Sequence, residues 1–187
     1  MSEKGTILIV EDRIIEKIGS FRQYLEKEGY SITVAENFKQ AQLELNELLR
    51  KNTIVGIILD LSFPKDENDK SAVNKEDIPY GAVLFNNNKF QLHIKNIPIV
   101  INTTGDDEYK RKYLGDINNL NVPIYNVNHE TNPLANSSGK QIKEILELFN
   151  HRVSIKNIAE DATWGDALKG KSVAKVNGKY VYTREGD

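Results

Sequence analysis

The sequence predicts an α/β protein built on a parallel sheet, and three observations lead to this fold class. Short apolar runs rich in β-branched residues occur at residues 6–10, 53–59 and 97–102, and their length suits strands buried on both faces of a sheet. Segments with helical periodicity alternate with these strands, as in βαβ units. Each run also ends on polar side chains, and open α/β folds place their chemistry at that edge of the sheet.

The other elements follow the same alternation. Two further strands are predicted at residues 30–35 and 122–127. Helices are predicted at residues 13–28, 38–50, 81 to about 93, 106–120, and 141 to about 151, the second of them after an N-cap at Asn37. Five strand–helix pairs in this order predict right-handed crossover connections.

Two segments depart from this alternation. Residues 65–80 are polar, without apolar periodicity, and too long for an ordinary connection, so we expect a functional or mobile loop. Residues 152–187 follow the main domain, at residues 1–151, as a short extension. They contain Trp164, and Asn177-Gly178 between two alternating runs predicts a β-hairpin. A lone hairpin needs a surface to pack on, either the main domain or a partner.

Composition excludes several classes of function. The chain has no cysteine and three scattered histidines, so thiolate sites and a zinc site are not expected. A formal net charge of −2 gives no electrostatic footprint for nucleic acid or an anionic membrane. No signal-peptide core or membrane-spanning run is evident, which makes a cytoplasmic location the expectation.

Polar residues end the three buried strands. Glu11 and Asp12 follow the first, Asp60 follows the second, and Thr103 follows the third. If these strands lie parallel and adjacent, three carboxylates and a hydroxyl converge at one edge. Simpler interpretations stay open: Glu11-Asp12 is also typical of a helix N-cap, and Asp60 of a residue that ends a strand or caps a helix.

These motifs resemble the receiver domain of response regulators over about residues 5–151. The resemblance is carried by Ile-Leu-Ile-Val-Glu-Asp at residues 7–12, Ile-Ile-Leu-Asp-Leu-Ser-Phe-Pro at 57–64, and Pro-Ile-Val-Ile-Asn-Thr at 98–103. It implies a doubly wound, five-stranded, flavodoxin-like sheet with strand order 2-1-3-4-5.

The resemblance also implies roles for the residues at the sheet edge. Asp60 would be the phospho-acceptor, Glu11 and Asp12 would join it as Mg²⁺ ligands, and Thr103 would be the switch hydroxyl that binds the phosphoryl oxygen. The chemistry is sensible in its own right, because Mg²⁺ is bound through a few carboxylates together with water and phosphoryl oxygens.

Three features depart from the family pattern. Receivers carry a lysine at the end of strand five, and residues 124–129 contain none, with Lys140 as the nearest. The loop after Asp60 is enlarged by residues 65–80. Thr103 is followed by Thr104, where the family prefers a smaller residue. The missing lysine should weaken phosphoryl stabilisation or uncouple it from the switch.

We therefore expect an atypical stand-alone receiver that binds Mg²⁺, accepts phosphate at Asp60 and signals through protein contact. Its expected partners are a sensor histidine kinase or phosphotransfer protein and a downstream protein target. Direct DNA binding is not expected, because residues 152–187 show no helix-turn-helix pattern. We expect no enzyme activity beyond autophosphorylation from small donors and autodephosphorylation, and homodimerisation stays open.

Two alternatives remain. A degenerate, phosphorylation-independent receiver would act as an interaction or assembly module, through the 65–80 loop and the extension. An aspartate-nucleophile phosphatase is less favoured, because such enzymes carry a second acid two residues after the nucleophile, where this chain has Ser62. Three tyrosines on the usual partner face of receivers are candidate interface anchors or core residues: Tyr109, Tyr113 and Tyr125.

Overall fold

The chain divides into two compact units, residues 1–153 and 154–187. The structure is a computed structural model, and it describes residues 4–103, 107–115, 124–128, 139–161, 171–176 and 179–184. Three features singled out in the sequence lie outside the described residues: Thr104, Trp164 and the Asn177-Gly178 turn.

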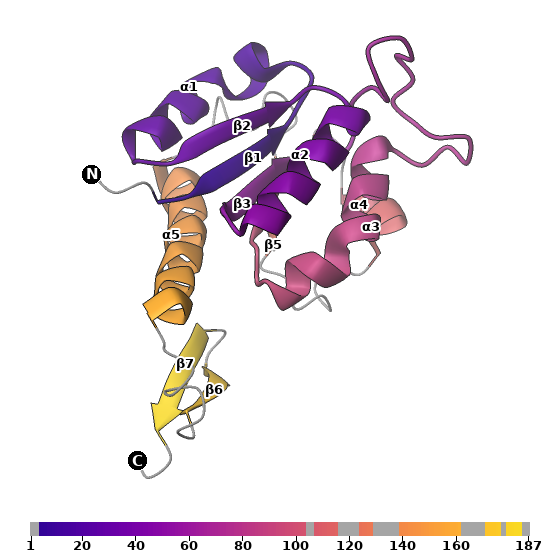
Figure 1. The fold of residues 1–187 in the computed structure, drawn as a ribbon. Helices are drawn as coiled ribbons and strands as arrows, with labels where there is room; N and C mark the ends of the chain where they lie inside the picture. Colours follow the sequence, from indigo (N-terminus) through magenta and orange to yellow (C-terminus); the bar gives the residue numbers. More distant parts are fainter. Residues whose placement is uncertain are drawn as a thin grey trace. The chain divides into compact units, whose positions relative to one another are not determined.

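The first unit is built on a parallel sheet in the order β2-β1-β3-β4-β5 (Figure 1). Its strands are β1 (Thr6–Val10), β2 (Ser31–Ala35), β3 (Ile54–Leu59), β4 (Ile99–Thr103) and β5 (Ile124–Asn128). Every pair of neighbouring strands is parallel. The order β2-β1-β3-β4 and the flanking helices confirm the predicted α/β fold class with its parallel sheet.

Helices cover both faces of this sheet (Figure 1). They are α1 (Ile14–Lys27), α2 (Phe38–Lys51), α3 (Tyr80–Ile94), α4 (Asp107–Leu114) and α5 (Gly139–Asp161). One hydrophobic layer joins the sheet to α1 and α5, and the other joins it to α2, α3 and α4. Side chains alternate between these layers along β1, β3 and β4, which explains why the strands read as continuous apolar runs.

The helix boundaries mostly follow the sequence prediction. Asn37 is the N-cap of α2, and its Oδ1 accepts the backbone N–H of Gln40 at 3.0 Å. The predicted end of α5 near His151 is too early, because the helix continues to Asp161. No Gly or Pro occurs between Lys140 and Trp164, so the sequence contains no helix-ending signal near His151. Of the predicted helix at 106–120, residues 116–120 lie outside the described part.

Gly56 in β3 lets α5 approach the sheet. A Cβ at this position would collide with the ring of Phe149, which is fully buried in the layer between the sheet and α5. The same ring packs against that of Tyr30 in a T-shaped arrangement, with ring centroids 6.2 Å apart. The missing side chain at position 56 therefore makes the space that the aromatic ring fills.

The segment after Asp60 contains no regular element up to Tyr80, yet it has a defined structure. The carbonyl oxygens of Pro64 and Lys65 accept the backbone N–H groups of Phe38 and Lys39 at the start of α2, at 2.9 and 3.1 Å. These bonds satisfy N–H groups that a helix leaves without intrahelical partners. The segment is thereby attached to the end of a core helix.

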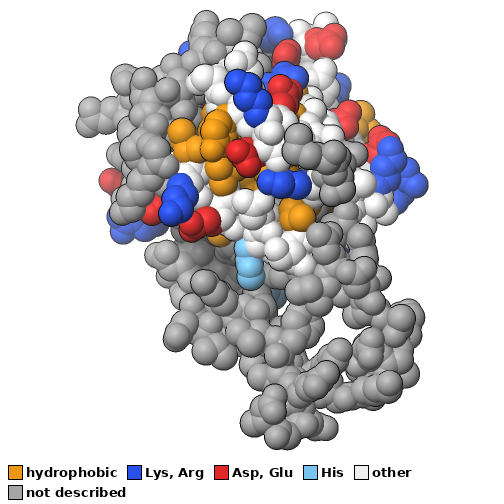
Figure 2. Space-filling view, turned by 90° about the vertical axis from the view of Figure 1, so that its left-hand side faces the viewer, with side chains coloured by type: hydrophobic (Ala, Val, Ile, Leu, Met, Phe, Trp, Pro, Cys, Tyr) orange, Lys and Arg blue, Asp and Glu red, His pale blue; other side chains and the backbone are white. Residues whose placement is uncertain are grey.

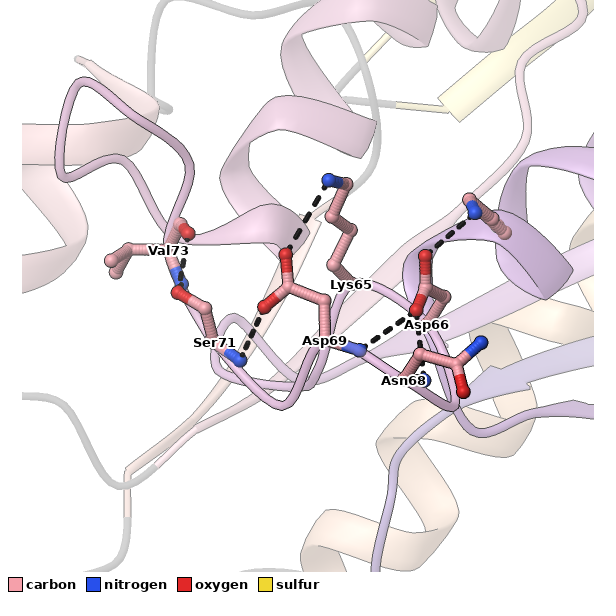
Figure 3. Close-up of polar contacts among 7 residues, drawn as sticks. Lys65, Asp66, Asn68, Asp69, Ser71 and Val73 are labelled. Atoms are coloured by element: carbon pink, nitrogen blue, oxygen red, sulfur yellow. Dashed lines mark hydrogen bonds and ion pairs between the residues drawn. The ribbon is translucent and has the colours of Figure 1, made fainter.

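Asp66 organises the first turn of this segment (Figure 3). Its Oδ1 accepts the backbone N–H groups of Asn68 and Asp69, at 2.9 and 2.8 Å, and its Oδ2 lies 2.6 Å from the Lys39 ammonium. The bond to Lys39 and then the two backbone donors hold the pKa of this carboxyl well below its usual range. The carboxylate thus joins the loop to α2 from outside the core.

A second turn follows in the same segment. Asn74 Oδ1 accepts the backbone N–H groups of Glu76 and Ile78, at 2.9 and 3.0 Å. Val73 and Pro79 form an antiparallel bridge that closes the turn. The expected loop is therefore present between β3 and α3, and its backbone is held by side-chain caps where regular structure is missing.

The second unit contains the remaining strands. β6 (Lys171–Val176) pairs antiparallel with β7 (Lys179–Arg184), with Val176 opposite Lys179.

Within the described residues, no helix has the length and apolar character needed to span a membrane. Among the described side chains on the face that Figure 2 shows, basic and acidic groups are interspersed.

We expect Gly56→Ala to lower the free energy of unfolding by about 1–3 kcal/mol, because the added methyl group enters the space of the Phe149 ring. Urea unfolding measures this loss. Combined with Phe149→Ala, the change should cost much less than the sum of the two single losses, since the double variant removes the collision. Additive losses would contradict the packing described here.

We expect Asp66→Asn to accelerate tryptic cleavage after Lys70 and Lys75, because the variant weakens the attachment to Lys39 and to the turn. Cleavage sites are followed by mass spectrometry under native conditions. Glu67→Gln is the matched control, since it removes an adjacent exposed carboxylate that forms none of these bonds. Equal cleavage rates in both variants would show that Asp66 does not hold the loop.

Candidate acid cluster at the carboxyl edge of the sheet

Asp60 is placed by the end of β3. Its backbone N–H donates to the carbonyl oxygen of Val10 at 3.0 Å, which extends the ladder between β1 and β3 by one step. Its side chain is 2 % exposed, and Oδ1 accepts the backbone N–H of Ser62 at 3.2 Å. The buried strand thus delivers a carboxylate to the sheet edge, and the following turn fixes its orientation.

Gly81 brings the start of α3 close to this carboxylate. Its backbone N–H donates to the carbonyl oxygen of Leu61 at 3.1 Å. A Cβ at position 81 would collide with the backbone of Asp60 and Leu61. The enlarged loop therefore returns to the site, and α3 supports the turn that carries Asp60.

Glu11 is placed by the end of β1 and is fully buried. Its backbone N–H donates to the carbonyl oxygen of Ala35 at 3.1 Å, and its Oε1 accepts the backbone N–H of Arg13 at 3.1 Å. The N-cap of α1 is Arg13, whose side chain makes no capping bond. The Glu11-Asp12 pair therefore does not supply the N-cap residue that the simpler interpretation offered.

Asp12 completes the cluster from its solvent side. Its side chain is one-third exposed, and its Oδ1 lies 3.9 Å from Arg13 Nε, a long surface ion pair of little energetic value. One carboxylate oxygen from each of Glu11, Asp12 and Asp60 lies within 4.8 Å of the others. The three acids singled out in the sequence are therefore brought together.

Thr103 ends the neighbouring strand β4 and is buried, with 4 % exposure. The pairing of β3 with β4 sets Leu59 opposite Ile101, so Thr103 lies two residues beyond the last paired position, at the same edge as the acids. The predicted hydroxyl is thus on the strand next to Asp60.

The donor set of the cluster suits a hard divalent cation. Three carboxylates offer oxygen ligands from one side, which suits the preference of Mg²⁺ for oxygen, and they leave its other positions for water or substrate oxygens. Two like charges about 5 Å apart repel by about 3 kcal/mol at an effective dielectric constant of about 20. A cation would remove this repulsion, so Glu11, Asp12 and Asp60 fit the ion that the sequence predicts.

Sequence reasoning missed the link between this site and α4. The phenol of Tyr109 is hydrogen-bonded to the side chain of Ser62, two residues after Asp60. Burial, followed by the nearby charges of Tyr113 and Asp60, raises the pKa of Tyr109. Only the tertiary structure shows this contact, because α4 and the turn after β3 are far apart in the chain.

Two buried polar residues were also missed. Asn102 in β4 is 1 % exposed, and Lys110 on α4 is 3 % exposed. The signal for Asn102 was available, because an amide inside an apolar strand run is unusual. Lys110 carried no such signal, since it lies in a strongly charged stretch of sequence that is typical of a solvent-exposed helix.

Comparisons with known proteins give a consistent result for the fold. No family model matches the chain, and no curated protein matches its sequence. Among solved structures, the signal receiver domain of a protein described as a LuxO repressor, from Vibrio parahaemolyticus, is 18% identical with a TM-score of 0.50. The match covers 84% of this chain and 98% of that one.

Two further structures extend this likeness. A response regulator receiver domain protein from Clostridium thermocellum is 15% identical, with a TM-score of 0.50 and coverage of 83% and 98% of the two chains. NtrX from Brucella abortus, in complex with ATP, is 16% identical with a TM-score of 0.52, over 93% of this chain and 32% of that one. The strand order, the position of the acid cluster and these likenesses lead to one conclusion: this chain has the fold of a response regulator receiver domain.

Proposed function

We propose that this protein is an atypical receiver that binds Mg²⁺ at Glu11, Asp12 and Asp60, accepts a phosphoryl group on Asp60 and signals through contact with another protein. The proposal rests on one observation. One carboxylate oxygen from each of these three residues lies within 4.8 Å of the other two, at the carboxyl edge of a sheet with the receiver fold. In this function the sheet has five strands, in the order 2-1-3-4-5, and β6 and β7 are the two strands of a hairpin.

The proposed reaction transfers a phosphoryl group from a donor to Asp60. A carboxylate oxygen of Asp60 attacks the phosphorus of a phosphohistidine or a small phosphodonor, and the new O–P bond makes an acyl phosphate. The P–N or P–O bond of the donor breaks, and its electron pair stays on the donor atom, which then takes a proton. Bound Mg²⁺ would neutralise charge on the phosphoryl oxygens and on the acids.

The residues of this chain position the acceptor for that step. The backbone N–H of Ser62 orients the Asp60 carboxylate, and that of Arg13 orients Glu11. Thr103, on the adjacent strand, is the hydroxyl that we assign to the phosphoryl oxygen. Because these side chains are held before the reaction, little conformational entropy is lost when the donor arrives.

The Tyr109–Ser62 hydrogen bond supports a route from the site to a partner surface. Ser62 contacts Asp60 through its backbone and α4 through its side chain. A rearrangement of the turn around phosphorylated Asp60 would therefore shift α4. The expected partners are a histidine kinase or phosphotransfer protein upstream and a protein target downstream, without direct contact with nucleic acid or membrane.

A degenerate receiver that works only as an interaction module is the second candidate. Its supporting observation is the ordered loop between β3 and α3, which is attached to α2 by Lys39 and Asp66. A second supporting observation is the apolar pair Phe90 and Ile94 on α3, whose side chains are 72% and 65% exposed. In this function the acid cluster would carry no phosphoryl group.

We expect intact-mass spectrometry to show one added phosphoryl group after incubation with Mg²⁺ and phosphoramidate, and none on Asp60→Asn. The variant keeps the size of the side chain and removes the nucleophilic oxygen. Glu44→Gln, at a half-buried acid of α2 outside the cluster, is the control and should be phosphorylated like the wild type. A wild-type protein that gains no phosphoryl group would favour the degenerate receiver.

We expect Mg²⁺ to raise the urea midpoint of the wild type, since an ion that binds only the folded state stabilises it. Without Mg²⁺, Asp60→Asn should be more stable than the wild type by about 1–3 kcal/mol, because it removes one of three neighbouring charges. The same variant should respond less to Mg²⁺. Equal Mg²⁺ responses in the two proteins would contradict a metal site at this cluster.

A further inference from the structure

Three polar residues lie side by side at the ends of β1, β3 and β4. Ile9, Ile58 and Val100 belong to one hydrophobic layer, which faces α1 and α5. Because side chains alternate along a strand, the residue two positions later points to the same face. Those residues are Glu11, Asp60 and Asn102.

The strand register sets these three residues level with one another. Val10 pairs with Leu59, and Leu59 pairs with Ile101, so the next residue of each strand forms one row across the sheet. Neighbouring strands lie about 4.8 Å apart. Asn102 is therefore the neighbour of Asp60 on the β4 side, and Glu11 is its neighbour on the β1 side.

The amide of Asn102 is buried, and no residue that the structure describes forms a hydrogen bond with it. Its side chain is 1 % exposed, and neither the amide oxygen nor the amide nitrogen has a hydrogen-bond partner among the described residues. A buried amide without partners is destabilising, and native structures contain few of them. Such a group calls for an explanation, and a bound ion or a part in the chemistry beside it is among the accepted ones.

The order of Glu11, Asp60 and Asn102 across the sheet decides whether the amide faces the cation or a group bound to Asp60. The three metal-binding oxygens come from Glu11, Asp12 and Asp60, so the cation belongs on the β1 side of Asp60. Asn102 lies on the opposite side. It is placed to contact a group carried by Asp60, away from the metal.

We propose that Asn102 is a phosphoryl-binding residue, whose amide N–H₂ donates to the phosphoryl group on Asp60. The inference rests on the proposed function. The amide supplies two N–H donors and no charge. A phosphoryl group arriving beside Glu11 brings more negative charge into an acidic row, and buried donors aimed at its oxygens offset that cost.

The experiment compares Asn102→Leu with Thr53→Val. Leucine keeps the approximate size of the side chain and removes both amide groups. Thr53 precedes β3 at the opposite edge of the sheet, and its hydroxyl oxygen is also buried without a hydrogen-bond partner among the described residues. Both changes should leave the urea midpoint unchanged or raise it, because replacing an unsatisfied buried polar group by an apolar one is neutral or stabilising.

The readouts are phosphorylation by phosphoramidate, followed by intact mass, and Mg²⁺ affinity, followed by calorimetry. Asn102→Leu should lower the rate or extent of phosphorylation at least about tenfold, the loss expected for one hydrogen bond to a charged group. Its Mg²⁺ affinity should stay within about threefold of the wild type, since the amide is away from the cation. Thr53→Val should match the wild type in both.

The outcomes separate this inference from the proposed function. If the wild type and Asn102→Leu are phosphorylated equally, the inference is wrong and the proposed function stands. If Asn102→Leu loses Mg²⁺ affinity as much as phosphorylation, the residue serves the metal or the fold, and the inference is wrong again. If the wild type accepts no phosphoryl group, both fall.

Discussion

The repulsion among three neighbouring carboxylates is the constraint on which the site depends. Two of them, Glu11 and Asp60, are buried, so water screens their charges poorly, and each accepts the backbone N–H of the residue two positions later. This repulsion is destabilising, and a cation bound between the carboxylates would offset it. The sheet is what enforces the arrangement, because adjacent parallel strands bring their carboxyl ends to one edge.

The rest of the fold holds that edge in place. Gly56 admits the ring of Phe149 on one face of β3, and Gly81 lets α3 contact the turn after Asp60 on the other. Both approaches depend on a missing Cβ. β3 is thus fixed between two helices, and Asp60, the residue that follows it, has little freedom to move away from Glu11.

The enlarged loop is better understood as a folded appendage of α2 and α3 than as a flexible connection. Its turns are closed by the carboxylate of Asp66 and the amide of Asn74, and Lys39 reaches it from α2. In the proposed function this loop is a folded neighbour of the site. Its shape would then help to decide which partner can approach Asp60.

The sequence by itself determined the α/β class, the parallel strands and the choice of the three acids as site residues. These follow from local patterns: the length of the apolar runs, the helical periodicity between them and the polar residues at their ends. It could not determine what depends on register or on contacts between distant segments. The row of Glu11, Asp60 and Asn102 exists only once β1, β3 and β4 are paired. The contact between Tyr109 and Ser62, the burial of Lys110 and the ordering of the loop by Asp66 were likewise decided by tertiary packing, which no local pattern encodes.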